Sequence, residues 1–76
     1  MAVTVYSKPA CSQCELTKKR MKDRGIPFEE VNLAEDPEAL AYVKDTLGFN
    51  QAPVVVAGDD AWSGFQPREI DRIDTN

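Results

Sequence analysis

The chain opens with alternating hydrophobic and polar positions and then changes to helical spacing. Residues 2–6 alternate and are rich in β-branched side chains, which predicts a strand. Residues 12–24 repeat their apolar positions every three or four residues, which predicts a helix with Gly25 as its C-cap. The predicted buried stripe of this helix consists of Cys14, Thr17 and Met21, with Leu16 beside it.

A second strand and a second helix follow. Residues 28–32 predict a strand, and because a helix separates it from the first strand, the two are expected to be parallel. Asp36 is a typical N-cap, and Pro37 suits the first helical position. The second helix is expected to continue until Gly48 stops it. Its apolar face consists of Leu40, Val43 and Leu47.

The last third of the chain predicts a hairpin and a short helix. An apolar strand at 53–57, a turn at 58–60 and a short strand at 61–63 follow one another. Gly64 ends the hairpin, and Pro67 starts the last helix. The predicted order is β-α-β-α-β-β-α, an α/β fold. The residues of the last helix that face the sheet are Ile70 and Ile73.

Size and composition are those of one globular domain over residues 1–76. The sequence is 42% hydrophobic and 29% charged, and it contains no low-complexity segment. It lacks an N-terminal basic segment followed by an apolar stretch, and no run approaches the roughly 18 apolar residues that a membrane helix needs. We therefore expect a cytoplasmic protein that does not enter a membrane.

Charge is distributed unevenly along the chain. The net charge is -4; residues 1–25 carry six basic and two acidic side chains, whereas residues 26–76 carry three basic and eleven acidic ones. A basic cluster in the first helix is either a solvated face or a docking surface for an acidic partner. The acidic total and the lack of a basic-aromatic stripe argue against nucleic-acid binding. The cluster consists of Lys18, Lys19, Arg20, Lys22 and Arg24.

The only two cysteines, Cys11 and Cys14, stand where the first strand leads into the first helix. A Cys-x-x-Cys pair at this position is typical of a dithiol that is oxidised and reduced in turn. Free backbone N–H groups at a helix start stabilise a thiolate, the form that attacks disulfides. We expect Cys11 to be the nucleophile and Cys14 to resolve the mixed disulfide. Because the chain has no histidine, the helix start and Lys8 are expected to lower the pKa of Cys11.

Other roles for the cysteine pair stay open at the level of the sequence. A structural zinc site takes four ligands, and two thiols without histidine supply them only across a bridging oligomer. A soft-metal carrier for Cu(I) needs no more than two thiolates. A purely structural disulfide is a poor staple here, because a bridge between positions three apart closes a very small loop.

With these elements placed, residues 2–73 resemble the glutaredoxins of the thioredoxin-fold superfamily. Three motifs narrow the resemblance to the NrdH redoxins, which are small glutaredoxin-shaped proteins that behave like thioredoxins. The resemblance implies a four-stranded mixed sheet flanked by three helices. The motifs are YSKPACSQC at 6–14, QAPVV at 51–55 and WSGFQP at 62–67.

The resemblance also implies a route for electrons. In it, NADPH reduces the chain through the flavoenzyme thioredoxin reductase, and the chain then reduces the large subunit of a class Ib ribonucleotide reductase. No bound cofactor is implied beyond the redox-active disulfide between Cys11 and Cys14. The chain is expected to act as a monomer.

Site residues also follow from the resemblance. The Ala52–Pro53 bond is expected to be cis and to face the dithiol, where the neighbouring backbone pairs with an extended segment of a partner. Trp62 and Phe65 either contact partners or pack in the fold. The expected groove and partner-binding residues are Lys8, Ser12, Gln13, Ala52, Pro53, Trp62, Ser63, Gly64 and Phe65.

Glutathione is the alternative electron donor. Glutaredoxins that use it are expected to carry a proline and a tyrosine between the cysteines and an acidic pair near the last helix. This chain has Ser12 and Gln13 at the first place and Gln66 and Pro67 at the second. Pro67 also lacks a backbone N–H that could bind a carboxylate. Glutathione is therefore expected to bind poorly, and a glutathione-dependent glutaredoxin is the second interpretation.

Overall fold

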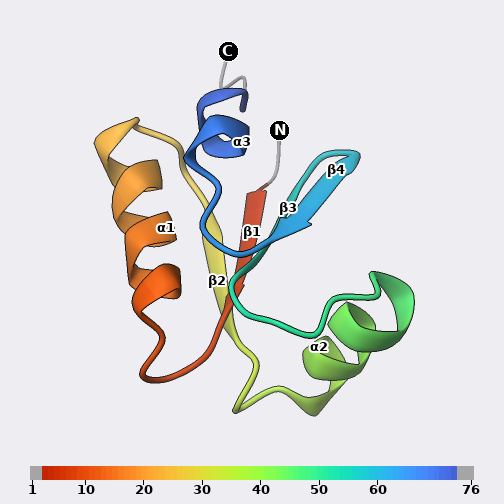
Figure 1. The fold of residues 1–76 in the computed structure, drawn as a ribbon. Helices are drawn as coiled ribbons and strands as arrows, with labels where there is room; N and C mark the ends of the chain where they lie inside the picture. The colour runs from red at the N-terminus through yellow and green to blue at the C-terminus, as the bar shows by residue number, and fades with distance from the viewer. Residues whose placement is uncertain (1–2, 74–76) are drawn as a thin grey trace.

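In the computed structural model, which describes residues 3–73, the elements follow the predicted order, except that the second helix is divided in two (Figure 1). Ala2, which the alternation assigns to the first strand, lies outside the described residues. The strands are β1 (Val3–Ser7), β2 (Glu29–Asn32), β3 (Val54–Ala57) and β4 (Asp60–Ser63). The helices are α1 (Ser12–Asp23), α2 (Pro37–Ala41), the π-helical η1 (Tyr42–Thr46) and α3 (Pro67–Asp71).

The four strands form one mixed sheet in the order β2-β1-β3-β4 (Figure 1). β1 and β2 are parallel because α1 carries the chain back between them. β1 pairs antiparallel with β3, and β3 pairs antiparallel with β4 across a tight turn. Val5 is therefore opposite Glu30 on one side and Val55 on the other. The prediction of a four-stranded mixed sheet is confirmed.

Helices cover both faces of this sheet. α1 and α3 lie side by side on one face, and α2 and η1 lie on the opposite side (Figure 1). Val3, Val5 and Ser7 of β1 are buried in alternation. Tyr6 turns its ring the other way, toward Tyr42 of η1, with ring centroids 6.1 Å apart. The main apolar core consists of Val3, Val5, Met21, Ile26, Val55, Ala57, Trp62 and Ile70.

α1 confirms the predicted buried stripe and corrects one position. Cys14, Thr17 and Met21 are 1%, 0% and 0% exposed. Leu16 is 48% exposed, because residues two apart in a helix do not share a face. After the helix, Gly25 has a φ of +69°, a left-handed conformation that glycine adopts without strain.

The second helix begins as predicted but does not continue as an α-helix. The Asp36 side chain accepts a hydrogen bond from the N–H of Ala39 at 3.0 Å and so caps the start of α2. After α2 the backbone widens into η1. There the N–H of Leu47 donates to the carbonyl of Tyr42, five residues back, at 3.1 Å.

The predicted apolar face of the second helix is only partly buried. The spacing of Leu40, Val43 and Leu47 predicts one apolar face on a regular helix. In the structure Val43 is 2% exposed, whereas Leu40 is 38% exposed. The spacing therefore predicts the burial of Val43 but not the exposure of Leu40.

Ion pairs occupy most of the basic cluster on α1. The Arg20 guanidinium donates to Asp71 of α3 twice, from Nε to Oδ1 at 3.1 Å and from Nη2 to Oδ2 at 2.6 Å. Arg24 approaches the same carboxylate at 3.3 Å. The other pairs are Lys18 with Glu15 and Glu30, and Lys19 with Asp23. This internal pairing favours the solvated-face interpretation of the cluster over a docking surface for an acidic partner.

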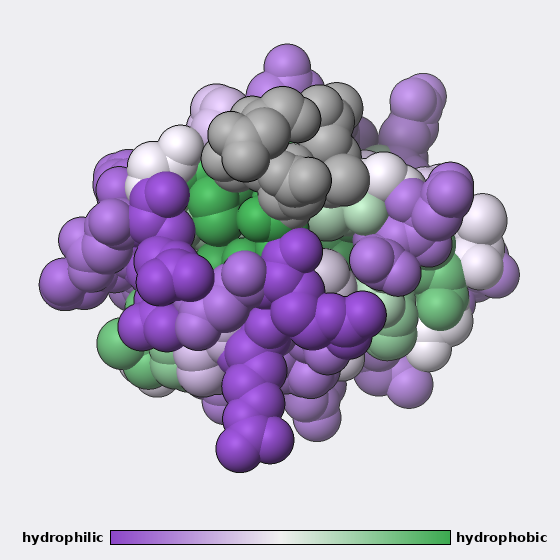
Figure 2. Space-filling view, turned by 90° about the horizontal axis from the view of Figure 1, so that it is seen from above, coloured by the Kyte–Doolittle hydropathy of each residue, from purple (hydrophilic) through white to green (hydrophobic). Residues whose placement is uncertain are grey.

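The end of the molecule that carries α3 is mainly hydrophilic. Figure 2 looks down on this end and shows polar and charged side chains over most of the surface, with small apolar patches between them. Ile70 of α3 is fully buried, and Ile73 is partly buried against the core. The predicted role of these two residues in covering the sheet is confirmed.

Candidate active site

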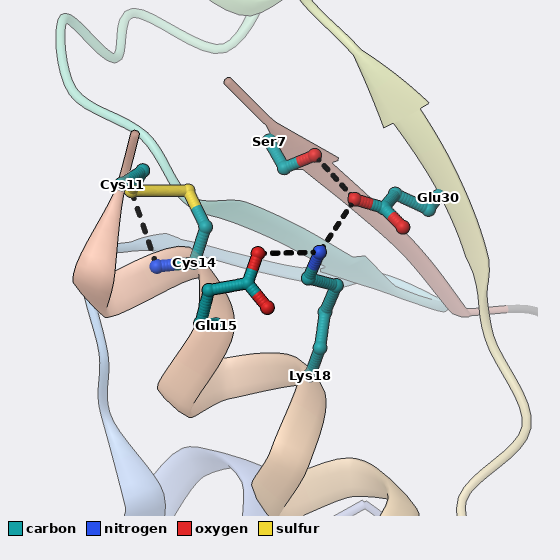
Figure 3. Close-up of polar contacts among 6 residues, drawn as sticks. All are labelled: Ser7, Cys11, Cys14, Glu15, Lys18 and Glu30. Atoms are coloured by element: carbon teal, nitrogen blue, oxygen red, sulfur yellow. Dashed lines mark hydrogen bonds and ion pairs between the residues drawn. A yellow bond between two sulfur atoms is a disulfide. The ribbon is translucent and has the colours of Figure 1, made fainter. Parts of the chain in front are cut away.

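The structure places Cys11 and Cys14 at the start of α1, joined by a disulfide bond (Figure 3). Cys11 is the N-cap of the helix: its backbone is extended, and its sulfur accepts the N–H of Cys14 at 3.1 Å. The two Cα atoms are 5.2 Å apart, a separation that one helical turn supplies. Cys14 is 1% exposed and Cys11 is half-buried. Of the two sulfurs, a partner therefore meets that of Cys11.

The start of α1 favours negative charge on Cys11. The first N–H groups of a helix have no carbonyl partner within it, and the N–H of Cys14 already points at the Cys11 sulfur. The positive end of the dipole of this twelve-residue helix lies at the same point. A thiolate formed when the disulfide opens is therefore held by a charge-assisted hydrogen bond. Lys8, on the loop before the helix, is exposed beside the same site.

A polar hollow of about 420 Å³ lies beside Cys11. The carbonyl oxygen of Ala52 is 3.9 Å from the Cys11 sulfur across it. The Ala52–Pro53 bond is cis, in agreement with the expectation from the resemblance, and Pro53 is buried. The hollow is lined by Lys8, Ser12 and Gln13 on one side and by Asn50, Gln51 and Ala52 on the other. We call it the dithiol groove.

A second hollow of about 270 Å³, mainly apolar, adjoins the dithiol groove and shares Lys8 and the loop 50–52 with it. Sequence analysis does not identify this apolar hollow, because its residues come from segments that the fold alone brings together. The one local signal is that two of its apolar side chains, Leu33 and Phe49, stand outside the regular elements. Its apolar walls are Leu33, Leu40, Val43 and Phe49.

The segment 62–67 is tied to the dithiol helix through Gln13. The side-chain oxygen of Gln13 accepts the N–H of Phe65 at 3.1 Å, across 52 positions of the chain. Gly64 has a φ of +81°, and a Cβ there would lie 3.4 Å from the same oxygen, so glycine suits both the backbone and the space. The N–H of Gly64 donates to the carbonyl of Pro53 at 2.8 Å. The dithiol helix, Pro53 and this segment therefore form one connected unit.

The aromatic residues of this segment differ in burial. Trp62 is 7% exposed and belongs to the core, opposite Val55 in the β3–β4 pair. Phe65 is half-buried and packs against the same core. Ser63 is half-buried, and its carbonyl accepts the side-chain N–H of Gln66 at 2.8 Å. The packing interpretation is therefore favoured for Trp62, whereas Phe65 keeps part of its side chain accessible.

A charged network lies beside the first turns of α1 (Figure 3). The Ser7 hydroxyl donates to Oε2 of Glu30 at 2.7 Å, and the Lys18 ammonium donates to the same oxygen at 2.9 Å and to Glu15 at 3.0 Å. The hydrogen bonds from Lys18 and then from Ser7 lower the pKa of Glu30, and those to Glu30 and Glu15 raise the pKa of Lys18. Sequence analysis does not identify this network, because Ser7 and Glu30 are 23 positions apart.

Glu30→Gln is expected to flatten the dependence of stability on pH in acid. The pKa of Glu30 is lowered from 4.5, so its contribution is complete above that value and is lost as the pH falls through the lower folded pKa. Lys18 stays charged throughout this range, because the ordinary lysine pKa of 10.5 already lies far above it and the pKa of Lys18 is raised further. The Glu30 side chain is 43% exposed, and solvent screening limits the effect to about 1 kcal/mol or less. Urea unfolding of the oxidised protein across the acid range measures it.

The matched control for this measurement is Glu29→Gln, which removes the same charge from the same strand without touching Lys18 or Ser7. Its acid unfolding is expected to follow the original chain more closely than that of Glu30→Gln. If the two variants lose stability in acid to the same extent, the network does not hold the Glu30 carboxylate as the structure indicates.

Within residues 3–73, no helix is long and apolar enough to cross a membrane. The same residues contain no group of three or more His, Cys, Asp and Glu side chains placed to hold a metal ion. The soft-metal ligands that the site offers are the sulfurs of Cys11 and Cys14, and here they are bonded to each other.

The fold and the site together define a class of protein. The fold has the order β-α-β-α-β-β-α, with a disulfide at the start of the first helix and the sulfur of the outer cysteine beside a groove. This is the arrangement of a thiol-disulfide oxidoreductase of the thioredoxin fold. A sequence model of the glutaredoxin family matches residues 3–62.

Known proteins narrow this class. The glutaredoxin-like protein NrdH of Escherichia coli (strain K12) is 45% identical over 73 residues, which cover 96% of this chain and 89% of that protein. NrdH of Lactococcus lactis subsp. lactis (strain IL1403) is 44% identical over 71 residues, covering 93% and 97%. The solved structure of NrdH-redoxin from Escherichia coli matches 100% of this chain and 99% of its own at a TM-score of 0.95 and 43% identity. The chain belongs to the glutaredoxin family and, within it, to the NrdH redoxins.

Proposed function

We propose that this chain is a cytoplasmic, monomeric electron carrier that NADPH reduces through thioredoxin reductase and that in turn reduces the large subunit of a class Ib ribonucleotide reductase. The Escherichia coli relative is described as a glutaredoxin-like protein with a thioredoxin-like activity profile. That description supports a reductase, rather than glutathione, as the electron donor. No bound cofactor is required, because the dithiol itself carries two electrons.

The start of α3 is the observation on which the proposal rests. Gln66 and Pro67 stand where an acidic pair is expected in glutaredoxins that use glutathione. Pro67 has no N–H, and the side-chain amide of Gln66 already donates to the carbonyl of Ser63 at 2.8 Å. Positions 66 and 67 therefore offer neither a carboxylate for the amino group of the γ-glutamyl end of glutathione nor, at Pro67, a backbone N–H for its carboxylate.

The shape of the site supports a protein as the partner. An extended protein segment that brings a disulfide to Cys11 lies along the dithiol groove and reaches the backbone of Ala52. The adjoining apolar hollow has room for an apolar side chain of the same segment. Glutathione, a short polar tripeptide, has no apolar side chain to place there.

The reaction follows from the order of the two sulfurs. In the reduced protein the Cys11 thiolate attacks one sulfur of the partner's disulfide, which forms a mixed disulfide and releases the other sulfur as a thiolate. The buried Cys14 thiol then loses its proton and attacks the Cys11 sulfur, which releases the partner's second thiolate. Two electrons have passed to the partner, and the Cys11–Cys14 disulfide has re-formed. One NADPH restores the dithiol through the flavin of the reductase.

The test supplies two reducing systems and measures NADPH consumption with an insulin disulfide as the acceptor. One system contains thioredoxin reductase, and the other contains glutathione and glutathione reductase. Consumption with thioredoxin reductase is expected to be faster by about tenfold or more, because glutathione lacks its charged contacts at the start of α3.

A glutathione-dependent glutaredoxin serves as the control that the glutathione system is active. A chain that turns over with glutathione and not with thioredoxin reductase would be a glutathione-dependent glutaredoxin, and the proposed electron donor would be wrong. Replacing insulin by the oxidised large subunit of a class Ib ribonucleotide reductase tests the acceptor. Failure to reduce that subunit under conditions that reduce insulin would contradict the proposed client.

A further inference from the structure

Two hydroxyl side chains are buried near the dithiol, and they differ in how they are satisfied. Ser7 is 4% exposed, and its hydroxyl donates to Glu30 at 2.7 Å. Thr17 is 0% exposed, and its Oγ1 has no hydrogen-bond partner among residues 3–73. A buried hydroxyl without a partner loses its hydrogen bonds to water and gains none in return. The Thr17 hydroxyl therefore destabilises the form of the protein seen here.

The position of Thr17 on α1 indicates which acceptor atom its hydroxyl can reach. Side chains of a helix lean toward its N-terminus, so residue 17 extends over the position three residues before it, which is Cys14. Both residues belong to the buried face of α1 and are shielded from water. On the other side of Thr17 along this face stands Met21, whose thioether is a weak acceptor. The Cys14 sulfur is the acceptor on this face that changes with the redox state.

Opening the disulfide changes the hydrogen-bonding capacity of the Cys14 sulfur. In the oxidised form the Cys14 sulfur is bonded to Cys11 and is a poor acceptor. Reduction adds two electrons and two protons to the disulfide and leaves two thiols, of which either can ionise. The Cys14 sulfur then becomes a thiol or, as it attacks the mixed disulfide, a thiolate, and a thiolate is a strong acceptor.

We propose that Thr17 is a positioning residue for Cys14, whose hydroxyl donates a hydrogen bond to the Cys14 sulfur in the reduced protein and lacks this partner in the oxidised protein. Thr17 thereby favours the open dithiol over the disulfide. The proposal rests on the opening and closing of the Cys11–Cys14 disulfide that the proposed function requires. It does not depend on which protein supplies or takes the electrons.

Thr17→Val tests the proposal, because valine keeps the shape of threonine and removes its hydroxyl. The protein is equilibrated with mixtures of reduced and oxidised dithiothreitol, and the fractions of dithiol and disulfide are counted by alkylation. The equilibrium constant for opening the disulfide is expected to fall about three- to tenfold, the range of one net hydrogen bond. Thr17→Ser keeps the hydroxyl and is expected to stay near the original value.

Thr4→Val is the matched control, since Thr4 is half-buried on β1, outside the buried face of α1, and is expected to leave the equilibrium unchanged. Urea unfolding of the oxidised and reduced forms gives an independent measure of the same effect. Thr17→Val is expected to raise the free energy of unfolding of the oxidised form relative to that of the reduced form. Equal changes in both forms, with an unchanged equilibrium constant, would show that Thr17 only packs or bonds its own helix, and would overturn the proposal. Because dithiothreitol replaces every protein partner, a failed reductase assay leaves this result unaffected.

Discussion

Cys11→Ser is expected to abolish disulfide reduction, lowering the rate by roughly a thousandfold or more. A serine hydroxyl stays protonated at neutral pH and does not attack a disulfide, so the hydrogen bond from the start of α1 has no thiolate to hold. Cys14 does not take over the first step, because its side chain is 1% exposed. Reduction of insulin by NADPH and thioredoxin reductase, followed as NADPH consumption, measures the loss.

The folded state of Cys11→Ser is the control for this result. Serine is also an accepted N-cap, so the start of α1 is expected to keep its capping hydrogen bond. The unfolding midpoint in urea should therefore lie close to that of the reduced original chain, which also lacks the disulfide. Turnover by a folded Cys11→Ser protein at the original rate would show that the chemistry does not begin at Cys11.

Local spacing is enough to predict the dithiol helix. The burial of Cys14 follows from its place three residues before Thr17 and seven before Met21, and the exposure of Cys11 follows from its place at the cap. The strands follow in the same way, because their alternation and the turn residues between them are read over a few positions. These features depend on residues that are close together in the chain, so they can be predicted from the sequence alone.

The surroundings of the dithiol depend on contacts that no local pattern contains. Gln13 reaches Phe65 across 52 positions, and Ser7 reaches Glu30 across 23. Both contacts need the register of the sheet and the angle at which α1 crosses it. The π-helical turn is also not predicted from the sequence, because the spacing of Leu40 and Val43 suits a regular α-helix. The apolar hollow beside the dithiol groove is likewise lined by separate segments that only the fold brings together, so local spacing does not predict it.

The basic cluster shows how the structure decides between interpretations that the sequence leaves open. A run of cations is equally consistent with a solvated helix face and with a docking surface. Arg20 and Arg24 both form ion pairs with Asp71, which lies 51 positions after Arg20. These ion pairs connect α1 to α3. The basic side chain that lines both hollows beside Cys11 is instead that of Lys8.

Cys14→Ser is expected to separate the two steps of the reaction. Cys11 keeps its N-cap position and the N–H that points at its sulfur, because that N–H belongs to the backbone of residue 14. The first attack therefore proceeds, but no thiol inside the protein attacks the mixed disulfide. Turnover with insulin is expected to fall by about a hundredfold or more, while a covalent adduct with the partner accumulates.

The adduct is the decisive measurement for Cys14→Ser. A non-reducing gel and intact-mass measurement should show this variant linked to a disulfide partner through Cys11, and a reductant such as dithiothreitol should release it. The double variant Cys11→Ser with Cys14→Ser is the matched control and should form no adduct. A Cys14→Ser protein that reduces insulin at the original rate without trapping it would contradict the resolving role of Cys14, because the buried cysteine would then take no part in the reaction.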